Sequence, residues 1–193
     1  MNSSAYANFD VWGVSLLGQV HAFKQYPTVL DKLLKRTGIT DNFDPAFLAT
    51  HWIPMQRWWQ LQHELVAEVG ASTSYSAGRK IAEAAPLPPE IDNIRAVLSA
   101  VDASYHMHHR KDGNVMFDPS TGTMLEGIGH YRCELHEAQT SATMTLDNPY
   151  SCDLDRGILT GFGARFEPAV SVTHMEGGCR KKGDNACQYL VQW

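Results

Sequence analysis

The chain has 193 residues, of which 44% are hydrophobic and 10% aromatic, enough for one well-buried core and too few for two large ones. Its formal net charge is −5, so the chain has no overall positive charge that would attract it to nucleic acid or to an anionic membrane. No apolar stretch is long enough to cross a bilayer and the first residues do not resemble a signal peptide, so we expect a cytoplasmic protein.

The first hundred residues carry apolar side chains at the spacing of amphipathic helices. Pro27 separates the first predicted helix from the second, and Gly38 and Gly70 follow the ends of the second and third. The adjacent Pro88 and Pro89 separate the last two. The predicted helices cover residues 12–23, 29–37, 54–69, 74–84 and 90–101.

After residue 104 the pattern changes to shorter runs that are typical of strands, bounded by Asp-Gly and Asp-Pro turns. One further helix is predicted at 153–166, with Asp153 as its N-cap, and the chain closes with a hairpin whose strands cover 169–175 and 186–193. Helices, meander, helix and hairpin in this order predict an α+β fold, with helices packed on an antiparallel sheet in a single domain, residues 1–193.

Two cysteines, Cys179 and Cys187, stand on either side of the hairpin turn near Gly183. In a regular hairpin they would face each other across the two strands. A cross-strand disulfide is one interpretation, although a reducing compartment disfavours it. Two small buried side chains are the second interpretation, and a metal site is the third.

A metal site needs more ligands, and the neighbouring sequence supplies candidates. Glu176 lies three positions before Cys179, and Cys152 lies where a strand meets the following helix. Three thiolates and one carboxylate form a closed tetrahedral set that Zn²⁺ accepts. The three consecutive basic residues at 180–182 would offset the negative charge of that set.

The segment from Cys152 to Trp193 contains CDLDRGILTGF and then the hairpin pattern Glu-x-x-Cys-x-x-x-Gly-Asp-x-x-Cys. It resembles the 4-vinyl-reductase-like domain family and is similar to the N-terminal effector domain of phenol- and toluene-sensing NtrC-type activators. The resemblance covers about the last 45 residues, continues weakly through SYSAGRKIAEA in the middle, and leaves residues 1 to about 50 unmatched.

In those sensors, zinc is held by a cysteine ahead of the helix, a glutamate and two hairpin cysteines. These positions match Cys152, Glu176, Cys179 and Cys187. The stretch between Cys152 and Glu176 is about one residue longer than in the family pattern. The resemblance therefore implies a structural Zn²⁺ as the cofactor.

The fold that the resemblance implies is a sandwich of helices and sheet, shared with a subunit of the TRAPP vesicle-tethering complexes and often dimeric, with the zinc hairpin at its C-terminal end. We therefore expect residues 1–50 to form an N-terminal helical extension and residues 51–193 to form the vinyl-reductase-like ligand-binding domain.

The function that the resemblance implies is a sensor for a small apolar or aromatic molecule, bound between helices and sheet. The chain has neither an ATPase motif nor a DNA-binding motif, so its signal would pass through homodimerisation or a partner protein. His106 is the predicted pocket histidine, because a strand histidine has that role in the sensors. The aromatic residues predicted to line the pocket are Trp58, Tyr105, Tyr131, Phe162 and Phe166.

The run YHMHHR at residues 105–110 allows a different interpretation. Imidazole and thioether groups both bind haem iron, so haem is an alternative cofactor. The sequence has no C-x-x-C-H attachment motif, and haem would therefore be bound non-covalently.

Two further classes of function stay open. One is an enzyme, by analogy with the vinyl reductase of bacteriochlorophyll synthesis for which the family is named. The sequence shows neither a dinucleotide-binding fingerprint nor a nucleophile–base arrangement, so no catalytic residue is assigned. The other is a structural module in which zinc only stabilises the hairpin.

Overall fold

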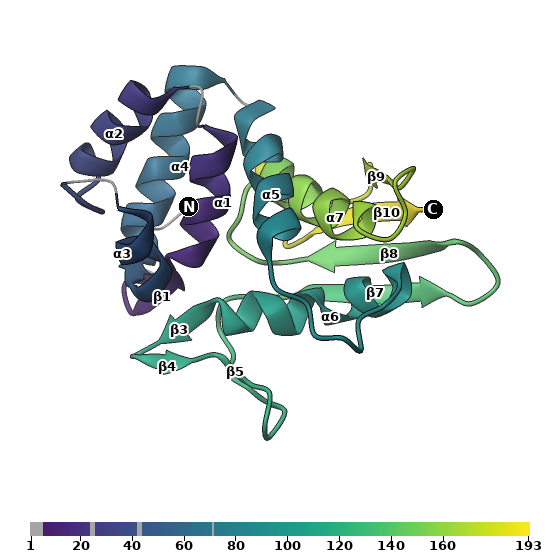
Figure 1. Cartoon of the computed structure of the whole chain (residues 1–193). Coiled ribbons are helices and arrows are strands. Elements are labelled where there is room, and N and C mark those ends of the chain that lie inside the picture. The colour runs from purple at the N-terminus through teal and green to yellow at the C-terminus, as the bar shows by residue number, and fades with distance from the viewer. Residues whose placement is uncertain (1–5, 24–25, 42–43, 71) are drawn as a thin grey trace.

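A computed structural model describes residues 6–23, 26–41, 44–70 and 72–193. Figure 1 shows helices α1 to α4 grouped on the side of the molecule away from the sheet formed by residues 131–146 and 171–192, with α5 and α7 beside that sheet. None of the described helices is long and apolar enough to span a membrane. The helices are α1 (Val14–Ala22), α2 (Pro27–Arg36), α3 (Pro45–Thr50), α4 (Met55–Val69), α5 (Ser72–Ala84), α6 (Ile94–Met107), α7 (Cys152–Ala164) and the 3₁₀ helix η2 (Arg180–Lys182).

The described strands form three antiparallel sheets, with orders β2-β1-β3-β4, β7-β8-β10-β9 and β5-β6. Helices packed on antiparallel sheets were predicted from the sequence, and this part of the fold prediction is confirmed. The strands are β1 (Phe9–Trp12), β2 (Trp52–Pro54), β3 (His109–Lys111), β4 (Asn114–Val115), β5 (Phe117–Asp118), β6 (Thr123–Met124), β7 (Tyr131–His136), β8 (Ser141–Leu146), β9 (Ser171–His174) and β10 (Cys187–Gln192).

A single apolar cluster runs from the N-terminal helices into the second sheet. Leu16, Leu33 and Leu48 belong to the same buried cluster as Leu98 and Val191. The first fifty residues therefore bury their apolar side chains against the rest of the chain, and helix α1 packs directly on α5. On the other side of the molecule, helix α6 packs on β7 to form a second layer.

Helix α6 departs most from the sequence-based expectation. The side chain of Asn93 caps its first turn by accepting from the amide of Ala96 at 2.9 Å. From there the apolar spacing of three and four residues continues to Tyr105, so the chain stays helical to Met107. The strand predicted at residues 104–110 is wrong except for its last two positions, and His106 lies on a helix.

Helices α5 and α7 touch at glycines. A Cβ atom on Gly78 would lie 2.2 Å from the backbone oxygen of Leu154, and one on Gly157 would lie 2.2 Å from the backbone oxygen of Tyr75. Real Cβ atoms do not approach other atoms so closely, because the repulsion forces the backbone apart. The two helices therefore need glycine at both positions.

Replacing Gly157 with Ala should lower the free energy of unfolding by about 3 kcal/mol, because the atoms it meets are backbone and cannot rotate away. Gly177→Ala is the matched control, since no atom lies within 4 Å of the Cβ it would add. Urea unfolding of both variants measures the difference. Equal stability of the two variants would contradict the close approach of the helices.

Candidate functional site

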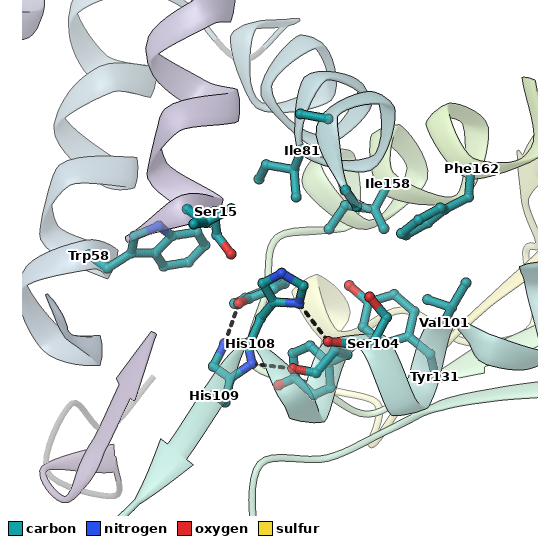
Figure 2. Close-up of a pocket in the computed structure, with 15 residues that line it drawn as sticks. Ser15, Trp58, Ile81, Val101, Ser104, His108, His109, Tyr131, Ile158 and Phe162 are labelled. Atoms are coloured by element: carbon teal, nitrogen blue, oxygen red, sulfur yellow. Dashed lines mark hydrogen bonds between the residues drawn. The ribbon is translucent and has the colours of Figure 1, made fainter. Parts of the chain in front are cut away.

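A cavity lies between the N-terminal helices and the layer of α6 and β7, and Figure 2 shows its lining. Its volume is about 50 Å³, and about 590 Å³ when the space open to solvent is included. Helices α1, α4, α5, α6 and α7 and the start of β7 all contribute side chains, most of them apolar or aromatic. An apolar cavity with a few polar groups is the usual form of a small-molecule site.

Four of the six residues predicted to bind a ligand line this cavity, namely Trp58, Tyr105, Tyr131 and Phe162. His106 and Phe166 are not part of its lining. The imidazole of His106 is completely buried, with Nδ1 2.8 Å from the carbonyl oxygen of Asp102. Its Nε2 has no partner among the described residues and no contact with solvent. The structure therefore places the predicted pocket histidine outside the pocket.

His108 is the imidazole with a ring nitrogen available in the cavity, and its ring lies among the lining residues in Figure 2. Nδ1 lies 2.7 Å from the carbonyl oxygen of Ser104, so Nδ1–H donates to that oxygen. Nε2 has no hydrogen-bonding partner in the described parts of the chain. Burial lowers the pKa of His108, so the ring is neutral and Nε2 carries a lone pair.

A helical interpretation of residues 104–110 would have selected His108 from the sequence. His108 follows Tyr105 by three residues, Ser104 by four and Val101 by seven, so all four belong on one helix face. Those three neighbours line the cavity as well. The strand interpretation did not suggest this, because in a strand side chains two residues apart share a face, which places His108 beside His106 instead.

The neighbouring His109 has both ring nitrogens occupied. Nδ1 lies 2.6 Å from the carbonyl oxygen of Tyr105, and Nε2 lies 2.6 Å from the hydroxyl of Tyr150. Burial lowers the pKa of His109 to about 3, so the neutral ring donates a hydrogen bond from Nδ1 and accepts one from the Tyr150 hydroxyl at Nε2. His109 thus fixes Tyr150 as a wall of the cavity and has no lone pair left for a ligand.

Behind the cavity wall lies a buried polar network. The hydroxyl of Tyr131 donates to Asp155 Oδ1 at 2.6 Å, and the other oxygen of Asp155 pairs with Arg180. Burial raises the pKa of Asp155, while the Arg180 guanidinium and the hydroxyl of Tyr131 oppose that rise. Burial also raises the pKa of Tyr131 well above its usual value, so Tyr131 stays protonated and is the hydrogen-bond donor to Asp155.

No known protein-family profile matches the sequence, and no curated protein matches it either. Solved structures do match. An H-NOX protein from Shewanella oneidensis in the Fe(II)NO state has a TM-score of 0.67 at 10% identity, covering 93% of this chain and 97% of that chain. An oxygen-binding H-NOX domain related to soluble guanylate cyclases has a TM-score of 0.62 at 15% identity, covering 94% of each chain. The chain has the H-NOX fold.

The H-NOX fold corrects two predictions. The resemblance to 4-vinyl-reductase-like domains is wrong as a family assignment, because the matching structures are H-NOX domains; the TRAPP-like sandwich is likewise not confirmed. The cofactor prediction, which placed zinc first and haem second, is wrong as well. One matching structure, with a TM-score of 0.64 and 15% identity over 94% of each chain, comes from work on haem redox potential and porphyrin distortion.

The three cysteines predicted as metal ligands do meet in this H-NOX fold. Donor atoms of Cys152, His174, Cys179 and Cys187 lie within 4.8 Å of one another, and we name these four residues the thiol cluster. Glu176 is exposed and does not belong to the cluster among the described residues. His174 stands where the glutamate was expected, because β9 ends beside β10 at that residue. That the cluster binds a metal ion stays a prediction.

Arg180 provides the positive charge beside the thiol cluster. Its backbone amide and its Nε each lie 3.3 Å from the sulfur of Cys187. Burial opposes the effect, but these contacts hold the pKa of Cys187 below its ordinary value. Burial and the neighbouring thiols raise the pKa of Cys152 to about 12, so Cys152 keeps its proton. The sulfurs of Cys152 and Cys187 are 3.5 Å apart.

His130 links α6 to the start of β7. Nδ1 lies 2.9 Å from a carboxylate oxygen of Asp102 and Nε2 lies 2.9 Å from Glu126. The other oxygen of Asp102 accepts from the amide of Tyr131 at 2.8 Å. Burial lowers the pKa of His130, but the two carboxylates outweigh burial and the net shift is upward.

This shift predicts a pH dependence of stability. Because the folded-state pKa of His130 lies above its unfolded value of about 6.5, protonation stabilises the fold below that pH. The contribution is lost as pH rises through the folded-state pKa. The melting temperature at pH 6 minus the melting temperature at pH 8 should therefore be larger in the wild type than in His130→Gln. The same pH profile in both proteins would show that His130 contributes nothing.

Proposed function

We propose that this chain is a haem-binding sensor domain that holds haem non-covalently in the cavity, with His108 as the protein ligand to iron. The observation that carries the proposal is the free Nε2 of His108 in an apolar cavity of an H-NOX fold. A histidine is the usual protein ligand of haem in sensors and carriers. The hydrogen bond from Nδ1 to the Ser104 carbonyl fixes the required tautomer and raises the basicity of Nε2.

The size of the cavity sets a condition on this proposal. A cavity of about 50 Å³ is smaller than a planar tetrapyrrole, and the large side chains of Trp58, Tyr131 and Phe162 line it. Haem binding therefore requires these side chains to turn outward or the N-terminal helices to separate from α6. The donor chemistry fits haem as it stands, but the space does not fit haem until these side chains or helices move.

Haem, when bound, supplies an iron centre at which a small gas molecule binds. The chain's own residues would hold the group and exclude water from it, since the cavity walls are apolar. The matched H-NOX proteins include an oxygen complex and states with NO and CO. By this likeness we propose a small gas as the ligand sensed, with the signal passed to a second copy or to a partner protein.

The test is a visible absorption spectrum of the purified protein, before and after addition of haemin, together with elemental analysis. We expect a Soret band and about one iron per chain after removal of excess haemin. Absence of the band after haemin has been added in excess would contradict the proposal. A band without stoichiometric iron retention would point to surface adsorption and would contradict it equally.

A second candidate is a haem-free sensor for a small apolar or aromatic molecule. The observation that favours it is the narrowness of the cavity, which suits one aromatic ring better than a porphyrin. Stabilisation of the protein by phenol or toluene in a thermal-shift assay, with no response to haemin, would favour this candidate. Stabilisation by haemin alone would reject it.

A further inference from the structure

A chain of buried contacts joins the cavity to the thiol cluster. It begins at the cavity wall, where Tyr131 donates its hydroxyl to Asp155 at 2.6 Å. It continues through the ion pair of Asp155 with Arg180, and it ends where Arg180 Nε donates to the sulfur of Cys187 at 3.3 Å. Each of these four side chains is at least nine-tenths buried. Solvent therefore does not screen or replace any step of the chain.

Asn148 makes hydrogen bonds to both members of the ion pair and so restricts their movement. Its side-chain amide donates to Asp155 Oδ1 at 3.2 Å, and its carbonyl oxygen accepts from Arg180 Nη1 at 2.8 Å. The guanidinium of Arg180 is thus held by Asp155, Asn148 and Cys187 at the same time. Arg180 cannot leave Asp155 without leaving the second carboxylate oxygen buried and unpaired among the described residues, which costs more than the bond itself is worth.

We propose that Arg180 couples the thiol cluster to the cavity, so that a change at the sulfur of Cys187 alters ligand binding at Tyr131. The cluster is then a regulatory site for the cavity ligand, and the part of this inference that concerns haem rests on the proposed function. Removing the sulfur as an acceptor frees Arg180 Nε, and the guanidinium moves toward Asp155 and Asn148. Because Asp155 Oδ1 accepts from both Tyr131 and Asn148, that movement reaches the cavity wall. Coupling of this kind is reciprocal for binding free energies.

The first experiment measures the dissociation constant of haemin in a double-mutant cycle of Cys187→Ala and Tyr131→Phe. Cys187→Ala should change the affinity at least about fivefold in the wild-type background and less than about twofold in the Tyr131→Phe background. Cys133→Ala is the matched control, because Cys133 lies on β7 outside the cluster and should leave the affinity unchanged. Independent effects of the two substitutions, or an equal effect of Cys133→Ala, would overturn the coupling.

The second experiment needs no cavity ligand, so it separates failure of the coupling from failure of the proposed function. The rate at which iodoacetamide modifies the cluster cysteines, located by mass spectrometry, should change at least about threefold in Tyr131→Phe. Tyr150→Phe is the control, since Tyr150 also lines the cavity but its hydroxyl pairs with His109. If haemin does not bind the wild type, this rate decides alone. Equal rates in both variants would reject the coupling.

Discussion

Replacing His108 with Ala should abolish stoichiometric haem binding, seen as loss of the Soret band after haemin is added and excess is removed. Among the described residues that line the cavity, the other imidazole belongs to His109, and both of its nitrogens are already hydrogen-bonded. Without His108 the iron has no free histidine nitrogen in the cavity lining, and the apolar walls alone hold a porphyrin loosely. Added imidazole should restore the band in this variant, because it can occupy the space that the side chain leaves.

His106→Ala is the matched control for this prediction. It removes a buried imidazole from the same region, at the end of the same helix, but one that does not line the cavity. Circular dichroism shows whether each variant keeps its fold. A band that survives in His108→Ala and disappears in folded His106→Ala would reverse the assignment and restore the histidine chosen from the sequence.

Most of the longer helices were predictable, because their apolar stripes are long and regular, whereas the short helix α3 was not predicted. The prediction for residues 54–69 agrees with α4 to within one residue, and that for 74–84 agrees with α5 to within two. The helix prediction failed at residues 104–107, where His and Met interrupt the apolar side chains at helical spacing and the alternation resembles that of a strand. Burial of Tyr105 on the helix face decides the conformation, and burial is a property of the whole fold.

The site was predictable only in part for a related reason. The meeting of Cys152 with Cys179 and Cys187 followed from their places beside a helix start and in a hairpin. His174 was missed because the register of β9 against β10 brings it to the cluster, and register cannot be deduced from spacing along the chain. The family was misjudged because a short hairpin pattern covers a minor part of the chain, whereas the H-NOX likeness extends over 93% of it at 10% identity.

Replacing Arg180 with Met should lower the free energy of unfolding by about 3–5 kcal/mol, because it leaves the carboxylate of Asp155 buried without a counter-charge. The side chain of Asp155 is 0% exposed and that of Arg180 is 9% exposed, so water cannot take the place of the lost partner. Lys181→Met is the matched control on the next residue. Lys181 pairs with Asp153 at the surface, where an ion pair contributes less than about 1 kcal/mol.

The double variant Arg180→Met with Asp155→Asn separates charge from packing. If the loss in Arg180→Met comes from an uncompensated charge, removing that charge should recover most of the stability. The loss in the single variant should also shrink as pH falls from 7 to 5. Burial already raises the folded-state pKa of Asp155, and without Arg180 only the hydrogen bonds from Tyr131 and Asn148 oppose that rise, so the pKa rises further and the folded state takes up a proton first. A pH-independent loss that the double variant does not repair would instead assign the contribution of Arg180 to its contacts with Asn148 and Cys187.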